Sequence, residues 1–366
     1  MHPPDGAGAP NAWGEPILDV RDLRTYFTPA QNIVSRFRIG KSLVRAVDGV
    51  DLAVFRGETV GLVGESGCGK STLGRSILRL VRPTSGDVLI DGIDVVNASG
   101  AQLRQIRRRA QIIFQDPASS LDPRMTVGQT IAEPLAIFNI RDRANRRARV
   151  RELLEQVGLP ANAEDRYPHQ FSGGQRQRVG IAAALALEPS VIIADEPTSA
   201  LDVSVQAQIL NLLQDLQRSL GVAYLFISHN LEVVRHLSDR VAVMYLGRIV
   251  ETAPADTLFD QPLHPYTRAL MRAIPDPDPS IRHQPVLLTG EIPSPLNPPS
   301  ACRFHPRCPI ARPRCAVDDP ALLGDADGHL VACHAVEWAR ANQRPGERLP
   351  DPSDWRDERL ASKGPQ

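Results

Sequence analysis

The sequence has little lysine. Lys41, Lys70 and Lys363 are its only lysines, and arginine supplies almost all of its basic charge. The 42 basic and 42 acidic residues balance, so no global field attracts nucleic acid or anionic lipid. No apolar run reaches the roughly 18 residues of a membrane-spanning helix. The first residues lack the basic and apolar regions of a signal peptide, so we expect the chain to stay in the cytosol.

Cysteine is also scarce, with five residues in the chain. In a reducing compartment so few thiols argue against a disulfide framework. Four of them, Cys302, Cys308, Cys315 and Cys333, lie close together in a proline-rich segment. Their spacing is neither that of a zinc C-x2-C pair nor that of a ferredoxin. The clustering favours a soft-metal site, and reduced, metal-free cysteines remain the alternative.

The composition changes along the chain. Residues 1–15 are rich in Gly, Pro and Ala, which predicts disorder. The segment 262–313 contains 13 of the 32 prolines. We therefore expect a main domain over 16–262, a small Cys/Pro-rich extension over 263–340 and a polar tail over 341–366. Each nucleotide motif described below occurs once, so no internal repeat is expected.

The segment from Gly64 to Ser71 fits the phosphate-binding pattern G-x-x-x-x-G-K-[ST]. The short apolar run Thr59–Val63 predicts a buried strand before it, and 70–81 predicts a helix after it. Glycines let backbone N–H groups turn toward phosphates, Lys70 adds a positive charge, and the hydroxyl of Ser71 can bind Mg²⁺. The residues of this predicted ATP-binding loop are Gly64, Glu65, Ser66, Gly67, Cys68, Gly69, Lys70, Ser71 and Thr72.

Further apolar runs at 191–194 and 223–227 predict buried strands, with a helix over 206–220 between them. This crossover predicts a parallel sheet and an α/β fold. Asp195 and Glu196 follow the first of these strands. A carboxylate there can hold Mg²⁺, and its neighbour can act as general base toward the attacking water.

A second motif makes the pattern more specific. Ser172, Gly173, Gly174 and Gln175 precede a helical run and stand between the phosphate loop and Asp195. In this order the motifs resemble the ATP-binding cassette (ABC) family over residues 16–265. The resemblance implies a P-loop ATPase core with a parallel sheet, an antiparallel β subdomain and a helical subdomain over about 116–185.

The resemblance also implies residue roles. Gln115 matches the glutamine that senses Mg²⁺ and water, and His229 matches the switch histidine that contacts the γ-phosphate. Asp202 falls in the D-loop. The S-G-G-Q segment implies a signature that closes in trans on ATP bound to a second cassette. Phe27 aligns best with the aromatic residue that stacks on adenine, and Tyr26 is the alternative.

The C-terminal segments around His264–Thr267, Cys302–Pro309 and Val331–His334 resemble the extension of oligopeptide/dipeptide importer ATPases. The segments Gly67–Arg75 and Leu121–Gly128 look like the second of the two ATPase subunits that these importers use. In some members this extension holds a [4Fe–4S] cluster. Zn²⁺ is the alternative, with His305 or His334 as further ligands. The resemblance implies ATP hydrolysis that drives peptide import at the cytoplasmic face of the cell membrane. The implied partners are a second ATPase subunit, two transmembrane permease subunits and, indirectly, an extracytoplasmic binding protein.

Other functions stay open at this point. Nickel or another small solute could replace peptides, and a soluble cassette protein acting on ribosomes or DNA, or a metal-cluster sensor with a vestigial cassette, are further alternatives. The basic runs 104–109 and 141–151 lack interleaved aromatic residues, so we interpret them as solvated helix faces rather than nucleic-acid contacts.

Overall fold

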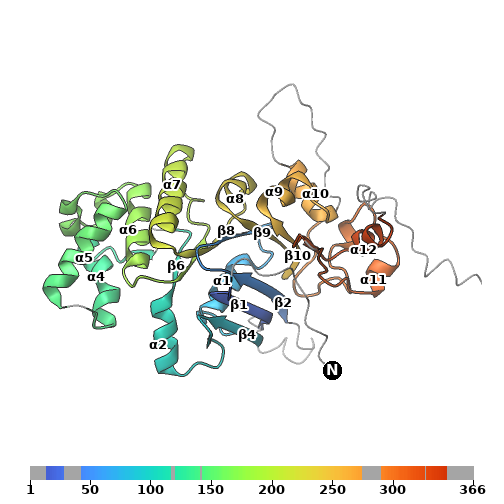
Figure 1. Cartoon of the computed structure of the whole chain (residues 1–366), viewed down its shortest axis with the longest axis horizontal. Helices are drawn as coiled ribbons and strands as arrows, with labels where there is room; N and C mark the ends of the chain where they lie inside the picture. Colours follow the sequence, from blue (N-terminus) through green and yellow to red (C-terminus); the bar gives the residue numbers. More distant parts are fainter. Residues whose placement is uncertain are drawn as a thin grey trace, which may run out of the picture.

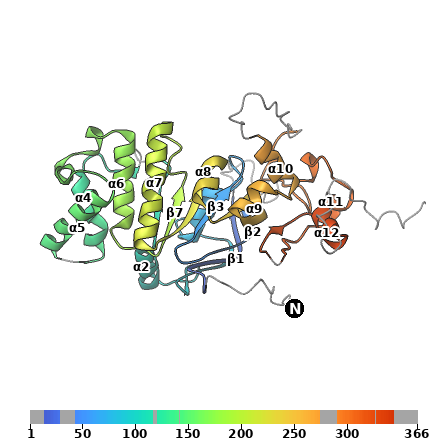
Figure 2. The same cartoon turned by 45° about the horizontal axis from the view of Figure 1, so that its top comes forward.

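A computed structural model describes residues 14–28, 43–116, 120–140, 142–273, 290–325 and 327–343. Most of the predicted disordered segment 1–15 and most of the predicted polar tail 341–366 fall outside the described residues. The described parts lie along one long axis (Figure 1). A group of helices occupies one end, the C-terminal region occupies the other, and two sheets lie between them (Figures 1 and 2).

The central sheet has the strand order β11-β10-β9-β3-β8-β7-β6. Neighbouring strands β9, β3, β8, β7 and β6 run parallel, whereas β10 is antiparallel to both β9 and β11. The strands are β3 (Thr59–Val63), β6 (Ala110–Ile113), β7 (Val191–Asp195), β8 (Ala223–Ile227), β9 (Arg240–Tyr245), β10 (Arg248–Pro254) and β11 (Leu330–Val331). The parallel sheet predicted from the sequence is confirmed, and its parallel strands bring their carboxyl ends to one edge.

A second, antiparallel sheet has the order β2-β1-β4-β5. Its strands are β1 (Leu18–Phe27), β2 (Val44–Val54), β4 (Ser85–Ile90) and β5 (Ile93–Asp94). Helix α1 (Lys70–Ile77) contacts both sheets and buries Leu73 and Ile77 between them. It is shorter than the predicted 70–81 because Arg79, with φ +51°, leaves the helical conformation.

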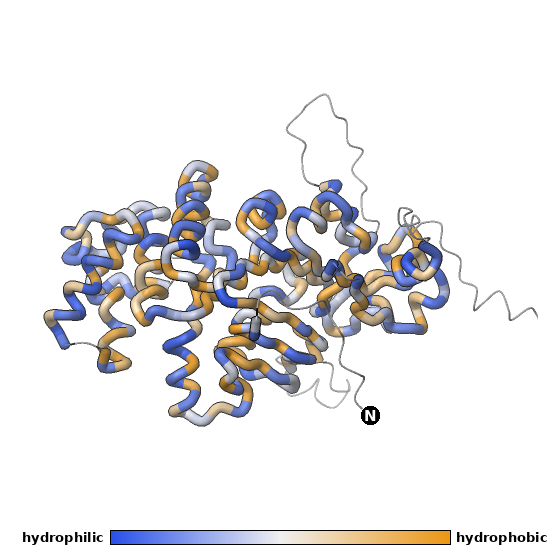
Figure 3. Tube along the Cα trace, viewed as in Figure 1, coloured by the Kyte–Doolittle hydropathy of each residue, from blue (hydrophilic) through white to orange (hydrophobic). Residues whose placement is uncertain are grey.

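The predicted helical subdomain consists of α4 (Val127–Ile137), α5 (Arg143–Gln156), α6 (Gly173–Leu185) and the short 3-10 turns η2 (Ala161–Asp165) and η3 (Pro168–Gln170). Ile131, Leu153 and Val179 are fully buried where these helices pack together. Helices α7 (Val203–Leu220) and α8 (Leu231–Leu237) follow β7 and β8. Helix α2 (Gly100–Arg109) buries only Ile106, and hydrophilic and hydrophobic residues alternate along it (Figure 3).

The C-terminal region contains α9 (Ala255–Asp260), α10 (Pro265–Arg272), η4 (His305–Arg307), α11 (Arg314–Val317) and α12 (His334–Ala341). It is continuous with the main sheet, because β11 pairs with β10. The buried carboxylate of Glu251 on β10 also accepts hydrogen bonds from the backbone N–H groups of Leu263 (2.7 Å) and His264 (3.0 Å), and contacts His329 Nε2 (2.7 Å). No helix in the described ranges has the length and apolar character that crossing a membrane requires.

Candidate functional site

The glycine loop joins β3 to α1. Gly69 precedes the helix with a φ of +112°, and a Cβ there would lie 2.1 Å from the carbonyl oxygen of Ala46, so only glycine fits. Lys70 is 4% exposed, and its Nζ donates to the carbonyl oxygens of Gly64 (2.8 Å) and Glu65 (3.1 Å). A helix N-terminus with a buried ammonium group beside it attracts phosphate.

Ser71 and Asp195 lie together at the start of α1. The Ser71 hydroxyl donates to Asp195 Oδ1 at 2.7 Å, and β7 ends at this aspartate. Burial raises the pKa of the Asp195 carboxyl, opposed by the hydrogen bond from Ser71 and by the guanidinium of Arg75, which lies 3.8 Å away. An oxygen pair of this kind is suited to Mg²⁺, which would restore the ionised form of the carboxylate.

Glu196 is the centre of a second polar group. Its Oε2 accepts a hydrogen bond from Gln115 Nε2 at 3.1 Å and lies 3.2 Å from His229 Nδ1. These three residues follow β7, β6 and β8, so the parallel sheet brings together side chains that are distant in the sequence. Glu196 has a φ of +48°, a strained conformation for this residue type that is often found at functional sites.

The S-G-G-Q segment forms the cap of α6. Ser172 Oγ accepts from the Gln175 N–H at 3.3 Å, and Gln175 Oε1 accepts from the Ser172 N–H at 3.0 Å. Both side chains are exposed, so the helix N-terminus faces outward. Asp202 caps α7 in a similar way, and the hydrogen bond from the Val205 N–H lowers the pKa of its carboxyl.

The two aromatic candidates for adenine differ in their surroundings. Phe27, at the end of β1, is 39% exposed. The hydroxyl of Tyr26 donates to Asp48, and the guanidinium of Arg45 lies 5.9 Å from the centre of its ring. The free face of Phe27 favours it over Tyr26, and the stacking role of Phe27 stays a prediction.

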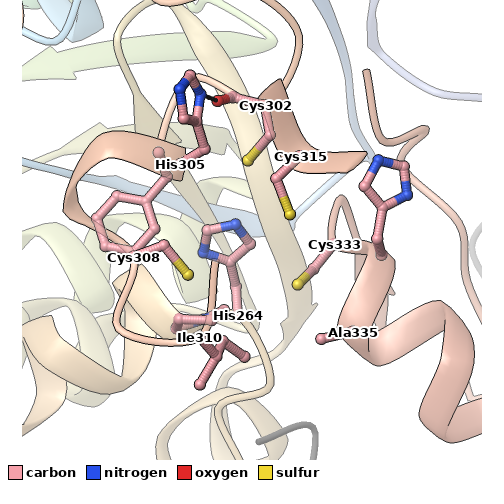
Figure 4. A pocket seen from close by; sticks show the side chains of 11 residues that line it. His264, Cys302, His305, Cys308, Ile310, Cys315, Cys333 and Ala335 are labelled. Carbon is pink, nitrogen blue, oxygen red and sulfur yellow. Dashed lines mark hydrogen bonds between the residues drawn. The ribbon is translucent and has the colours of Figure 1, made fainter. Parts of the chain in front are cut away.

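The four clustered cysteines line one small pocket. In Figure 4 the sulfur atoms of Cys302, Cys308, Cys315 and Cys333 point toward a shared space, with His264 beside it. All of these thiols are free, and burial raises the pKa of Cys302, Cys308 and Cys333 to about 12. Among the described residues, no group of three or more His, Cys, Asp or Glu side chains is placed so that it could hold a metal ion.

The histidines predicted as alternative metal ligands have other partners. His305 Nδ1 bonds the Cys302 carbonyl oxygen at 2.8 Å, and its ring turns away from the sulfur atoms (Figure 4). His334 Nε2 bonds the carbonyl oxygen of Asp318 at 3.0 Å, and its Nδ1 lies 3.4 Å from Glu337 Oε2. Both histidines line the pocket, and each has a ring nitrogen engaged by a backbone carbonyl oxygen.

The C-terminal region also reaches the glycine loop, which the sequence analysis did not predict. Along the chain, the cysteine segment is separated from the glycine loop by more than 200 positions. In the structure Arg307, directly before Cys308, forms an ion pair with Glu65, and the hydroxyl of Tyr266 accepts from the Glu65 N–H. Both residues lie in segments used above for the resemblance, but only their position in the fold brings them to the loop.

Comparisons with known proteins agree with this geometry. The family profile described as "ABC transporter" matches residues 47–199, and "Oligopeptide/dipeptide transporter, C-terminal region" matches residues 250–315. Two solved structures share the fold. The ATP-binding cassette MJ0796, in a dimeric post-hydrolysis state bound to ADP and Pi, has a TM-score of 0.57 at 31% identity and covers 65% of this chain and 98% of its own. CbiO1 of Clostridium perfringens has a TM-score of 0.56 at 30% identity, covering 67% and 91%.

Curated relatives are more similar in sequence. A "Probable peptide ABC transporter ATP-binding protein" of Sinorhizobium fredii is 57% identical over 81% of this chain and 84% of its own length. The oligopeptide transport ATP-binding protein OppF of Salmonella typhimurium is 51% identical over 88% and 96%. The corresponding protein AppF of Bacillus subtilis is 50% identical over 87% and 97%.

Proposed function

Because this chain belongs to the ABC transporter family and is one of its ATP-hydrolysing subunits, we propose that it drives the import of peptides. The observation that carries this proposal is the C-terminal region, which matches the oligopeptide/dipeptide transporter type over residues 250–315. The peptide and oligopeptide names of similar proteins support the same solute class. We divide the chain into a nucleotide-binding domain over 16–262 and an extension over 263–340.

The site residues receive roles that follow from their positions. Lys70 and the N–H groups of the glycine loop hold the phosphates of ATP, and Ser71 and Asp195, with Gln115, hold Mg²⁺. Mg²⁺, when bound, neutralises the charge that develops on the phosphates. Glu196 accepts the proton of the attacking water.

Further residues complete the reaction site. His229, which contacts Glu196, orients that carboxylate and lies at the same sheet edge as the phosphate loop. We assign Phe27 to adenine. The exposed cap formed by Ser172 and Gln175 would act on ATP bound to the opposite cassette, because an exposed helix N-terminus stabilises phosphate charge.

This arrangement needs partners. We propose a second ATPase subunit, a distinct chain, together with two transmembrane permease subunits and an extracytoplasmic binding protein that selects the peptide. The chain would then be a peripheral protein on the cytoplasmic side of the cell membrane. The dimeric state of the related cassette MJ0796 supports the pairing of two cassettes.

We further propose that Cys302, Cys308, Cys315 and Cys333 hold a [4Fe–4S] cluster, with Zn²⁺ as the alternative. Four sulfur atoms directed at one pocket fit the all-thiolate ligand set of such a cluster. Metal binding deprotonates thiols outright, so their raised pKa values in the metal-free state do not oppose it. Anaerobic purification should yield iron and sulfide. Stoichiometric zinc without iron would replace the cluster assignment by a Zn²⁺ site. Free alkylation of all four thiols in native protein, with neither metal bound, would refute the site.

The transport proposal is tested in the native cell membrane. Cells that carry the wild-type gene or the Glu196→Gln variant are compared for uptake of a labelled tripeptide and of labelled nickel. Peptide uptake that only the wild type supports is the expected result. Nickel uptake alone would assign the subunit to a metal importer, and co-purification with ribosomes instead of permease subunits would refute a transport role.

A further inference from the structure

Glu65, an acidic residue of the phosphate loop, is held from two sides by the C-terminal region. The guanidinium of Arg307 donates two hydrogen bonds to its carboxylate, Nη1 to Oε2 at 2.9 Å and Nη2 to Oε1 at 3.1 Å. The hydroxyl of Tyr266 accepts a hydrogen bond from the Glu65 backbone N–H at 2.9 Å. These partners lie 242 and 201 positions farther along the chain.

Both partners are fixed by packing. The side chain of Arg307 is 6% exposed, and its guanidinium lies 5.8 Å from the ring centre of Tyr245. Tyr266 is fully buried, and its ring centre lies 4.7 Å from that of Tyr245 and 5.5 Å from that of Phe304. Side chains whose rotamers are locked by packing can hold a neighbouring group in one geometry.

The charge of Glu65 matters because the loop is expected to receive the phosphates of ATP. An unpaired carboxylate in that loop would repel the phosphates, and a two-pronged arginine pair neutralises it. The backbone of Glu65 matters as well. Its carbonyl oxygen accepts a hydrogen bond from Lys70 Nζ at 3.1 Å, beside the bonds from Nζ to the Gly64 carbonyl oxygen at 2.8 Å and to Cys68 Sγ at 3.8 Å. The position of Glu65 therefore influences where the positive charge of the loop lies.

We propose that Arg307 and Tyr266 are positioning residues of the ATP site, through which the C-terminal region neutralises Glu65 and holds the phosphate loop in its binding shape. This inference rests on the proposed assignment of residues 64–72 as the phosphate loop. It requires neither a metal in the cysteine pocket nor a particular solute. If the contact only attached the C-terminal region to the cassette, its effect on ATP binding would not depend on charge balance. Removing the charges of Arg307 and Glu65 together therefore distinguishes positioning of the loop from simple attachment.

The test is a double-mutant cycle on the full-length protein, made of Arg307→Gln, Glu65→Gln and the two combined. Binding of a fluorescent ATP analogue with Mg²⁺ is titrated. Arg307→Gln should weaken binding about tenfold, because it leaves a carboxylate uncompensated near the phosphates. The combined variant should return to within about threefold of wild type. Arg307→Lys, which keeps the charge without the fork, should fall between them.

Two further variants sharpen the result. Tyr266→Phe keeps the ring but removes one neutral hydrogen bond, so binding should weaken roughly three- to tenfold. Arg340→Gln is the matched control. It removes an arginine of the C-terminal region whose Nη2 pairs with Asp325 at 3.1 Å, and affinity should stay within about twofold of wild type. In the assembled transporter Arg307→Gln should raise KM for ATP and leave kcat nearly unchanged, whereas general loosening of the protein would lower kcat as well.

Wild-type affinity in Arg307→Gln would overturn the proposal. A combined variant as weak as Arg307→Gln alone would do the same, because lost packing would then explain the effect. If Arg307→Gln does not fold, the combined variant and Tyr266→Phe test the proposal instead. Near-normal ATP binding in the combined variant together with weaker binding in Tyr266→Phe supports the positioning role, and any other result refutes it. Lys70→Ala tests the assignment of the phosphate loop separately from the role of the C-terminal region. Unchanged ATP binding in Lys70→Ala would refute the loop assignment itself, whereas lost binding there with normal binding in Arg307→Gln would refute only the role of the C-terminal region.

Discussion

Replacing Glu196 by Gln should separate ATP binding from hydrolysis. The amide has nearly the shape of the carboxylate and can keep one contact to Gln115 or His229, which now lie 3.1 and 3.2 Å from Oε2. The fold should therefore be preserved. The amide cannot accept the proton of the attacking water, and loss of a general base costs about 10²–10⁴ in rate. This corresponds to roughly 3–5 kcal/mol of transition-state stabilisation.

The assay compares steady-state phosphate release by the assembled transporter with ATP affinity of the isolated subunit. ATP affinity should remain near wild type, and the two cassettes should stay associated in ATP because the bound nucleotide is not hydrolysed. Glu155→Gln is the control, since Glu155 is exposed on α5 and its loss should leave hydrolysis unchanged. Steady-state activity of Glu196→Gln close to wild type would refute the assignment of the base.

Three further predictions concern other parts of the chain. Ser172→Arg should leave ATP binding to the isolated subunit intact but block hydrolysis in the assembled dimer, if the exposed cap acts on the opposite cassette as proposed; full activity would refute the role in trans. Cys308→Ser should lose bound metal and, because Arg307 is its neighbour, should also weaken ATP binding several-fold. Metal loss with unchanged ATP affinity would show that the two sites are not coupled. Burial lowers the pKa of His264 to about 4, opposed by Glu251, while the unfolded side chain titrates near 6.5. The free energy of unfolding should thus fall as the pH drops from about 6.5 to 4, by up to about 3 kcal/mol, and His264→Asn, which keeps a helix-capping acceptor, should show a flatter urea-unfolding profile over that range.

The buried strands could be predicted because each is a short apolar run beside a motif. The predicted strand over 223–227 coincides with β8, and the predicted 191–194 falls one residue short of β7. A sheet whose strands run parallel also predicts that residues following them meet at one edge. Gln115, Glu196 and His229 do meet there. Helix starts were less accurate, since α7 begins at Val203, after the cap Asp202, rather than at 206.

Two features could not be predicted from sequence patterns. The strained backbone of Glu196, with φ +48°, depends on how β7 leaves the sheet, and its N–H donates to the Ile227 carbonyl oxygen at 2.9 Å. The contact of Arg307 with Glu65 depends on the path of the C-terminal region back across the sheet. No periodicity or spacing encodes a contact between residues so distant in the chain.

The turn between Cys302 and Cys308 connects the cysteine pocket to the cassette. Arg303 in this turn donates to Asp48 and to the carbonyl oxygen of Leu246, Phe304 packs on Tyr266, and Arg307 pairs with Glu65. A metal held by the cysteines at both ends would order this turn, which also carries the arginine that pairs with Glu65 of the glycine loop. Coupling between two sites is reciprocal. If metal binding at the cysteines raises the affinity of the loop for ATP, ATP binding must therefore raise the affinity of the cysteines for the metal by the same factor.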